Sequence, residues 1–565
     1  MDEQCRERIL SEDYVDFIWK SGFDLETLQE QYPGICIQQI STFFTVFYVN
    51  SKDLGAAPEQ EFGYEILPGL YTLLENESLE ASQILQIQNQ PVLRLRGNGV
   101  ILGFVDTGID YTNSCFRDLS GRSRILEIWD QTIQTGNPPE GLNYGSVYTN
   151  EDINRALSEE IPERIVPSVD EIGHGTELAA IAGGSMDETR GWIGAAPEAE
   201  LAMVKLKPAK NYLREYFMVP PDALAYQEND IMLGVRYLLE FSERERKPLV
   251  ICMALGNNMG GHSGTGPLAT YLNSVSVRDG RCVVTAGGNE ANQGHHYYGT
   301  LPPGQTFEDV ELRVADDEYG LMMELWSSTP DVFSLALFSP TGEEIPRIAA
   351  KEGVQRFEFL FEETTVYITF QALDPYSGDQ LIVIRMRSPS AGIWRLRVIG
   401  SRKINGIYNI WLPVSGFIDS GTVFLRPNPD ITLTEPSNAE LPITVGAYQS
   451  RNHSIYIDSS RGFTRRERIK PDLTAPGVQV STFASGNRFT FATGTSAAAA
   501  VTAGAAALLL EWGIVRGERP GMDTTGIKQL LIRGADRTSS LAYPDRSWGW
   551  GTLNLYAAFQ ALGRF

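Results

Sequence analysis

The sequence has few cysteines and no long unbroken apolar run, and each shortage excludes a class of protein. Cysteines are scattered and lack CxxC spacing, so neither a disulfide framework nor a cysteine zinc site is expected at Cys5, Cys36, Cys115, Cys252 and Cys282. Cys252 and Cys282 stand in apolar, strand-like runs and are expected to be small buried hydrophobic residues. No run reaches the ~18 apolar residues that a spanning helix needs, so no membrane span is expected.

Positive charge is also scarce. The chain has 71 aspartates and glutamates against 47 lysines and arginines, a formal net charge of −24, which repels phosphate backbones and argues against a nucleic-acid partner. The short basic run RGFTRRERIK at 461–470 is expected to be a solvated loop. The N-terminus opens acidic and lacks a basic start followed by an apolar stretch, so the sequence predicts no signal peptide and a cytoplasmic location at synthesis.

The overall composition is that of a globular protein, and the chain is too long for a single hydrophobic core. With 565 residues, 42% of them hydrophobic and 21% charged, several domains are expected. Within residues 1–76, strand-like stretches at 13–22 and 36–51 flank a helical pattern at 24–32. This order predicts a small α+β domain that ends near residue 76.

Residues 77–301 and 437–565 favour an α/β domain. Short, nearly continuous apolar runs such as VILGFVD and PLVICMAL alternate with helical patterns, which indicates a mostly parallel, doubly wound sheet. A ligand site is then expected at the carboxyl ends of the strands. Between the two parts, residues 302–436 show alternating strands at regular spacing, which predict an inserted all-β sandwich or jelly roll.

Three polar residues stand where an apolar element starts or stops. Asp106 ends an apolar strand, His174 lies between two glycines at the head of a helix, and Ser496 begins a helix of small residues. Each alone commonly serves as a turn former, a loop residue or an N-cap. Together, in this chain order, they are the parts of a nucleophile activated by an imidazole that a carboxylate orients.

Two further segments fit the same chemistry. Asn289 follows a strand and two glycines, and its amide is expected to donate to an oxyanion. Ala254, Leu255 and Gly256 form another strand end, expected to pair with an extended peptide substrate. The other histidines lack such flanks, and loop or surface positions are expected for His262, His295, His296 and His453.

On the motifs VDTGID, GHGT, AGGNE, KPDLTAPG and GTSAAAA, the chain resembles the subtilisin-like serine proteases, the subtilases. The resemblance implies a subtilisin-like fold with Asp106 as orienting acid, His174 as base, Ser496 as nucleophile and Asn289 in the oxyanion hole. No cofactor and no metal ion are expected. Residues that depart from the family pattern, at Glu177, Ala497 and Ala500, remove no catalytic atom.

More narrowly, the N-terminal domain, the insertion and the stretches ILEIWDQT and SWGWGTLNL resemble the Csp-type subtilases of spore-forming clostridia. That resemblance implies a prodomain that acts as a chaperone, is cut by its own active site and stays bound as an inhibitor. It also implies a protein substrate, the precursor of a spore cortex-lytic hydrolase, and a spore-associated location. Cleavage is expected between about residues 70 and 80.

Two other functions remain open from the sequence. Because some relatives have lost triad residues, the chain is alternatively an idle pseudoprotease that acts as a sensor or binding protein. The inserted domain is alternatively a carbohydrate-binding module, since its strand pattern does not distinguish roles. A structural role, as a rigid clamp on the α/β domain, is the favoured expectation for the insertion.

Overall fold

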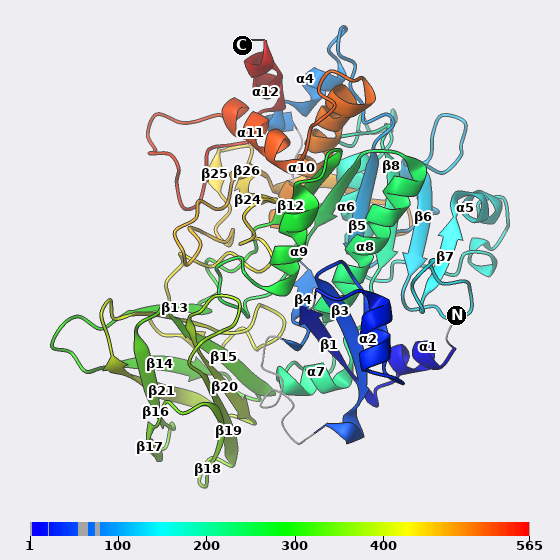
Figure 1. The fold of residues 1–565 in the computed structure, drawn as a ribbon. Coiled ribbons are helices and arrows are strands. Elements are labelled where there is room, and N and C mark those ends of the chain that lie inside the picture. The colour runs from blue at the N-terminus through cyan, green and yellow to red at the C-terminus, as the bar shows by residue number, and fades with distance from the viewer. Residues whose placement is uncertain (1–2, 21, 55–65, 74–79, 564–565) are drawn as a thin grey trace.

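The computed structural model describes residues 3–20, 22–54, 66–73 and 80–563. A small N-terminal domain lies against a large α/β domain, and a β-sandwich projects from the α/β domain at the lower left of Figure 1. The predicted domain boundary near residue 76, and residues 74–79 of the predicted cleavage window, fall outside the described residues.

The central sheet is mostly parallel, as the apolar runs predict. Its described strands follow the order β25-β24-β12-β10-β5-β8-β6-β7, with β26 paired to β24. Pairings from β24 to β6 are parallel, while β7 and β25 are antiparallel edges. The strands are β5 (Ile101–Asp106), β6 (Ile125–Asp130), β7 (Ser146–Thr149), β8 (Glu200–Lys205), β10 (Leu249–Met253), β12 (Arg281–Ala286), β24 (Ile443–Gln449), β25 (Ser454–Ile455) and β26 (Leu473–Pro476).

Helices cover both faces of this sheet. One core cluster contains α6 (His174–Gly183) and α10 (Thr495–Leu510), and a second contains α8 (Glu228–Glu245) and α9 (Pro267–Ser276). Both faces of the sheet are therefore buried, which explains why the strand sequences are continuous apolar runs instead of alternating apolar and polar residues. Peripheral elements of this domain are α4 (Ile84–Gln88), α5 (Asn150–Ala156), α7 (Asn211–Tyr216), β27 (Val478–Ala484), β28 (Arg488–Thr493), α11 (Thr524–Gly534) and α12 (Leu555–Leu562).

Helix α10 is the centre of the catalytic-domain core. Every residue from Thr495 to Leu510 is buried, because small side chains let neighbouring backbones approach closely. The segment Thr495–Val515 is long and apolar enough to cross a membrane by length and composition, contrary to the expectation from apolar runs. Since 83% of its most apolar window is buried inside the fold, it is a core helix here.

The insertion forms two antiparallel sheets that share one apolar core. One sheet has the order β13-β22-β15-β20-β19-β18 and the other β17-β16-β21-β14-β23. The first strand, β13, starts at His296, a few residues before the predicted start of the insertion. The strands are β13 (His296–Thr300), β14 (Phe307–Val314), β15 (Gly320–Ser327), β16 (Val332–Phe338), β17 (Glu344–Ile348), β18 (Gly353–Phe359), β19 (Thr364–Gln371), β20 (Gln380–Arg387), β21 (Gly392–Arg402), β22 (Ile407–Trp411) and β23 (Val423–Phe424).

Side chains expected at the surface are buried where the sandwich meets the α/β domain. His262 and His296 stack on Trp411, with ring centroids 4.0 and 4.8 Å away. Burial lowers the pKa of His262 to about 3 and that of His296 to about 4. His295 is also buried, with Nδ1 2.5 Å from a carboxylate oxygen of Glu290. The prediction allowed loop or surface positions. His262 and His295 lie in loops and His296 in β13, and all three are buried, so the surface alternative is wrong for each.

The basic run at 461–470 is likewise not a solvated loop. Arg465 is buried, and its guanidinium donates to Asp379 of the insertion at 2.5 Å and to the carbonyl of Gly261 at 2.6 Å. Lys470 is buried beside Asp472, and burial lowers its pKa to about 7. Arg465 therefore connects the sandwich to the α/β domain, while Lys470 is paired within the α/β domain. Charge density in the sequence indicated neither contact.

The N-terminal domain is the predicted small α+β unit. Its antiparallel sheet has the order β1-β3-β2. Side chains of this sheet, including Ile18, Val46 and Tyr48, share a hydrophobic core with α8 and α9 of the α/β domain. The elements are α1 (Glu3–Leu10), β1 (Tyr14–Lys20), α2 (Leu25–Gln31), β2 (Cys36–Gln39) and β3 (Phe44–Asn50).

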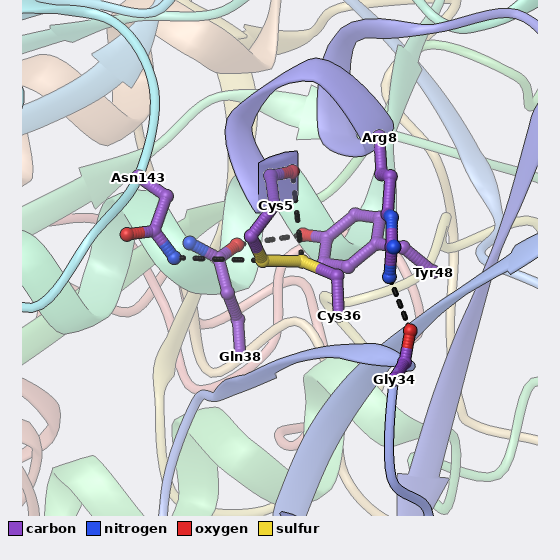
Figure 2. The surroundings of a disulfide bond; sticks show 7 residues. All are labelled: Cys5, Arg8, Gly34, Cys36, Gln38, Tyr48 and Asn143. Atoms are coloured by element: carbon purple, nitrogen blue, oxygen red, sulfur yellow. Dashed lines mark hydrogen bonds between the residues drawn. A yellow bond between two sulfur atoms is a disulfide. The ribbon is translucent and has the colours of Figure 1, made fainter. Parts of the chain in front are cut away.

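A disulfide joins Cys5 of α1 to Cys36 of β2, with Cα atoms 5.1 Å apart (Figure 2). The sequence analysis excluded a disulfide framework and so missed this pair, because the packing of α1 on the sheet brings together cysteines with no characteristic spacing. Asn143 of the α/β domain reaches the Cys5 sulfur at 3.8 Å. Cys115, Cys252 and Cys282 are free and buried, as predicted for the last two, and burial raises the pKa of each thiol.

The close packing of α10 generates a stability prediction. A Cβ added to Gly504 would lie 2.3 Å from the Ala195 Cβ and 2.9 Å from the Ala182 carbonyl oxygen. We expect Gly504→Ala to lower the free energy of unfolding by about 1–3 kcal/mol, since overpacking forces α10 and its neighbours apart. Denaturant titration measures this, with Gly521→Ala as the control because nothing lies within 4 Å of that added Cβ. Equal midpoints for both variants would contradict the packing described.

Candidate active site

The carboxyl end of β5 and the start of α6 bring two of the predicted site residues together. His174 Nδ1 lies 2.8 Å from Asp106 Oδ1, and both side chains are almost completely buried. The same Asp106 oxygen accepts from the backbone N–H of Thr107 at 2.7 Å. A carboxylate bonded to Nδ1 fixes the imidazole so that Nε2 is the nitrogen that takes up a proton.

The glycines around His174 have specific steric causes. Gly173 has φ 93°, a left-handed conformation at the N-cap of α6. At Gly175, a Cβ would lie 2.2 Å from the Gly108 carbonyl oxygen and 3.2 Å from Asp106. Only glycine lets α6 approach β5 closely enough for the His174–Asp106 bond.

Asp170 holds the first turn of α6 and was missed in the sequence. Its carboxylate accepts from Gly173 N at 2.8 Å, Thr176 N at 2.9 Å and Thr176 Oγ1 at 2.7 Å. An aspartate that accepts N–H groups at the start of a helix stabilises that terminus. Asp170 therefore sets the orientation from which His174 projects. The signal available was the spacing from Asp170 to the Gly-His-Gly turn.

Ser496 lies in the first turn of α10, after Gly494, whose φ of 144° again favours glycine. Its Oγ is buried and forms no hydrogen bond with any residue that the structure describes. The Ser–His hydrogen bond of a working triad is thus not formed in this structure, as is common before substrate binds. Because it heads α10, Ser496 places its backbone N–H at the positive end of the helix dipole.

Asn289 is tied to the same turn. Its Oδ1 accepts from the Thr495 backbone N–H at 3.0 Å and from Thr495 Oγ1 at 3.2 Å. Thr495 Oγ1 in turn accepts from Gly288 N at 3.0 Å. With Oδ1 engaged, the Nδ2 end of the amide is the donor beside Ser496. A backbone N–H and a side-chain amide at a helix start can together stabilise an oxyanion.

The residues predicted to bind an extended peptide pair with the chain itself. Leu255 and Gly256 form β11, which pairs antiparallel with Leu73 and Thr72 of β4 (Leu70–Leu73). The other edge of β4 pairs with β9 (Tyr226–Gln227). The segment just before residues 74–79 therefore runs between two strands of the α/β domain as an extended peptide. Ala254 directly precedes β11.

Among the described residues, no group of three or more histidine, cysteine, aspartate or glutamate side chains is placed to hold a metal ion. The chemistry of the assembled groups is that of acyl transfer: a hydroxyl nucleophile, an imidazole oriented by a carboxylate, and amide donors for an oxyanion.

The fold and this site define a subtilisin-like serine endopeptidase, and comparison with known proteins agrees. The model of the subtilase family matches residues 97–307 and 425–551, so the chain belongs to the subtilase family. The unmatched interval between these ranges is occupied by the β-sandwich.

Among solved structures, the chain is similar to the CspB protease of Clostridium perfringens, with a TM-score of 0.77 and 32% identity, covering 86% of this chain and 97% of that one. It is 32% identical to the serine protease AprX of Bacillus subtilis over 126 residues, 19% of this chain and 27% of AprX. It is 22% identical to C5a peptidase of Streptococcus pyogenes over 453 residues, 73% of this chain and 34% of that protein. The chain thus spans about a quarter to a third of these two curated relatives.

The geometry at Asn289 generates a kinetic prediction. We expect Asn289→Ala to lower kcat on a fluorogenic peptide by about 10²–10³-fold, with KM little changed, because the lost donor acts on the transition state. That is the loss found when one oxyanion donor is removed from a protease of this family. Asn452→Ala is the matched control, since Asn452 Oδ1 accepts from Ser454 N at the surface. An equal loss in both variants, or a change confined to KM, would contradict the role of Asn289.

Proposed function

We propose that this chain is a serine endopeptidase that first cuts its own chain between the N-terminal prodomain and the catalytic domain and then cleaves a protein substrate. Ser496 Oγ attacks the scissile carbonyl carbon while His174 Nε2 takes up its proton. Asp106 holds the imidazole and stabilises the imidazolium. Asn289 Nδ2 and the Ser496 N–H stabilise the oxyanion, and His174 then gives its proton to the leaving amine. Water, deprotonated by the same imidazole, releases the acyl group.

The pairing of β4 with β9 and β11 is the observation that carries this proposal. A protease holds its substrate extended, with main-chain hydrogen bonds along a strand edge. Here the chain's own residues Leu70–Leu73 pair antiparallel with both strands, and Leu73 lies opposite Leu255, the residue after Ala254. The first peptide bond to be cut therefore follows β4 closely, within the predicted window.

After the cut, a buried ionic contact retains the prodomain. Asp16 of β1 is fully buried and forms an ion pair with Lys210 of the catalytic domain, 3% exposed. Its other carboxylate oxygen accepts from Gln227 Nε2 at 2.9 Å and Asn229 Nδ2 at 3.0 Å. Because Gln227 belongs to β9, the same strand binds both Asp16 and β4. The prodomain thus stays in the groove as an inhibitor.

The substrate and location rest on resemblance. On its likeness to Csp-type subtilases, the protein substrate is the precursor of a spore cortex-lytic hydrolase, and the enzyme is spore-associated. The inserted sandwich, with jelly-roll character, serves as a rigid clamp through contacts such as Arg465–Asp379. An idle pseudoprotease is not supported, since Asp106, His174 and Ser496 are all present and the first two are bonded. No observation favours a carbohydrate-binding function.

Autoprocessing is tested by intact mass. We expect the wild-type chain to yield two fragments whose masses add to that of the chain plus one water, with the new terminus between residues 70 and 80. Ser496→Ala should stay as one uncut chain, because the nucleophile is gone. The N-terminal sequence of the larger fragment locates the cut. An uncut wild type, or a cut Ser496→Ala chain, would refute processing by this site.

Retention is tested by Asp16→Asn in the processed protein. Removing one member of a buried ion pair leaves Lys210 uncompensated, at a cost of about 3–5 kcal/mol. We expect the fragments to separate on size-exclusion chromatography and the inhibition of peptide hydrolysis to fall at least about 100-fold. The control is Asp53→Asn, which changes an exposed carboxylate of the same domain. If the prodomain fragment still co-elutes with the catalytic fragment in both variants, Asp16 is not what retains the prodomain.

A further inference from the structure

A pocket lies where the catalytic domain, the inserted sandwich and the segment before β4 meet. One wall is formed by the catalytic-domain segment from Asn257 to Gly261, and the opposite wall by Trp326, Asp374 and Tyr376 of the insertion. The space free of atoms between these walls is about 700 Å³, open solvent included. Gly69, the residue directly before β4, borders it and projects no side chain into it.

Three acidic residues are among those that line the pocket. Glu228, Asp374 and Glu435 all face the pocket, and each is no more than 6% exposed. No lysine or arginine occurs among the described lining residues. Such a concentration of buried acids, without a cation inside the pocket, favours occupation by a group with positive charge.

Glu435 has one carboxylate oxygen without a partner. Its Oε2 is buried and forms no hydrogen bond with the part of the chain that the structure describes. Glu228 already accepts from Gly69 N at 3.2 Å and Leu268 N at 3.0 Å, and Asp374 accepts from Ser377 N at 2.6 Å. A buried acceptor without a donor is costly, so a ligand that supplies a donor at Glu435 is stabilised there.

Burial and the neighbouring Glu228 raise the pKa of Glu435 to about 8, against smaller opposing effects of a Gly264 backbone hydrogen bond and of Arg468. Burial is also the main cause that raises the pKa of Asp374, which faces Asp379 and Arg465. The empty pocket thus holds protonated Glu435 near neutral pH, and an entering cation displaces that proton to solvent.

We propose that this pocket is a distal substrate subsite that accepts a lysine or arginine side chain from the residue at the position of Gly69. The inference rests on the proposed function, since it requires substrates to pair with β9 and β11 as β4 does. The aromatic rings of Trp326 and Tyr376 give the aliphatic stem of such a side chain an apolar wall, and Glu435 receives its terminal donors.

The subsite gives the insertion a second role and explains the glycine in the prodomain. The insertion supplies one wall, so it takes part in substrate selection as well as holding the domain rigid. Because Gly69 has no side chain, the chain's own segment makes no contact of this kind with the pocket and gains no binding energy from it. A substrate with a basic residue at that position gains it and so competes better with the retained prodomain segment for the groove.

The test uses the processed full-length protein and peptides of the sequence at residues 66–80. These peptides carry the native glycine or the replacements Gly69→Lys, Gly69→Leu and Gly69→Glu. We expect kcat/KM to be at least about 10-fold higher for the lysine peptide than for the glutamate peptide, and above that of the leucine peptide. Retained prodomain lowers all rates alike and cancels in these ratios.

Two variants assign the effect to the pocket. In Glu435→Gln, and independently in Asp374→Asn from the insertion, the lysine-to-glutamate ratio should fall several-fold. Glu344→Gln, an exposed glutamate of the insertion, should keep the wild-type ratio. Thermal melting confirms that each variant is folded, and either pocket variant alone suffices if the other does not fold.

The outcomes are distinct. Equal rates for all peptides, a preference for leucine, or a lysine preference that survives in the folded pocket variants would overturn the subsite while leaving the protease intact. If no peptide is cleaved, even the one with native glycine, the proposed function fails and a substrate subsite fails with it.

Discussion

Main-chain hydrogen bonds on both edges of β4 are the constraint on which the contact between the N-terminal part of the chain and the α/β domain depends. A strand held between β9 and β11 fixes where the N-terminal domain sits, because Gln227 of β9 also binds Asp16 from that domain. The pairing uses backbone atoms only, so a sequence unlike that of β4 can replace it. Under the proposed function, inhibition by the N-terminal domain and substrate binding use the same pairing.

The sequence predicted the parts whose residue types are dictated by local chemistry. Apolar runs predicted the parallel sheet because its strands are buried on both faces. The glycines beside His174 and before Ser496 predicted helix starts, and the structure supplies the steric reason: a left-handed N-cap at Gly173 and no room for a side chain at Gly175. Asp106 and His174 meet as expected. These features repeat wherever the same chemistry is built, so short motifs suffice to find them.

Contacts between domains were beyond the reach of sequence patterns. Arg465 reads as one of several surface cations, yet it lies buried against Asp379, more than eighty residues earlier in the chain. His262 and His296 read as loop residues, yet they enclose Trp411. The packing of two domains determines which residues meet in each of these contacts. The residue spacing within either segment does not predict them. The same holds for the Cys5–Cys36 pair, which depends on how α1 rests on its sheet.

The position of the sandwich within the central sheet has a consequence for how the chain folds. Strands β12 and β24 are hydrogen-bonded neighbours, paired from Val284 to Ile443, yet the whole sandwich separates them along the chain. Closing so long a loop costs entropy before the new pairing returns any energy. The chain segments that enter and leave the sandwich are joined by a hydrogen bond from Asn428 N to His296 O. A compact sandwich therefore brings the two ends of the insertion together and shortens the loop that must close between β12 and β24. The β12–β24 pairing therefore spans the insertion at a lower entropic cost than its length along the chain implies.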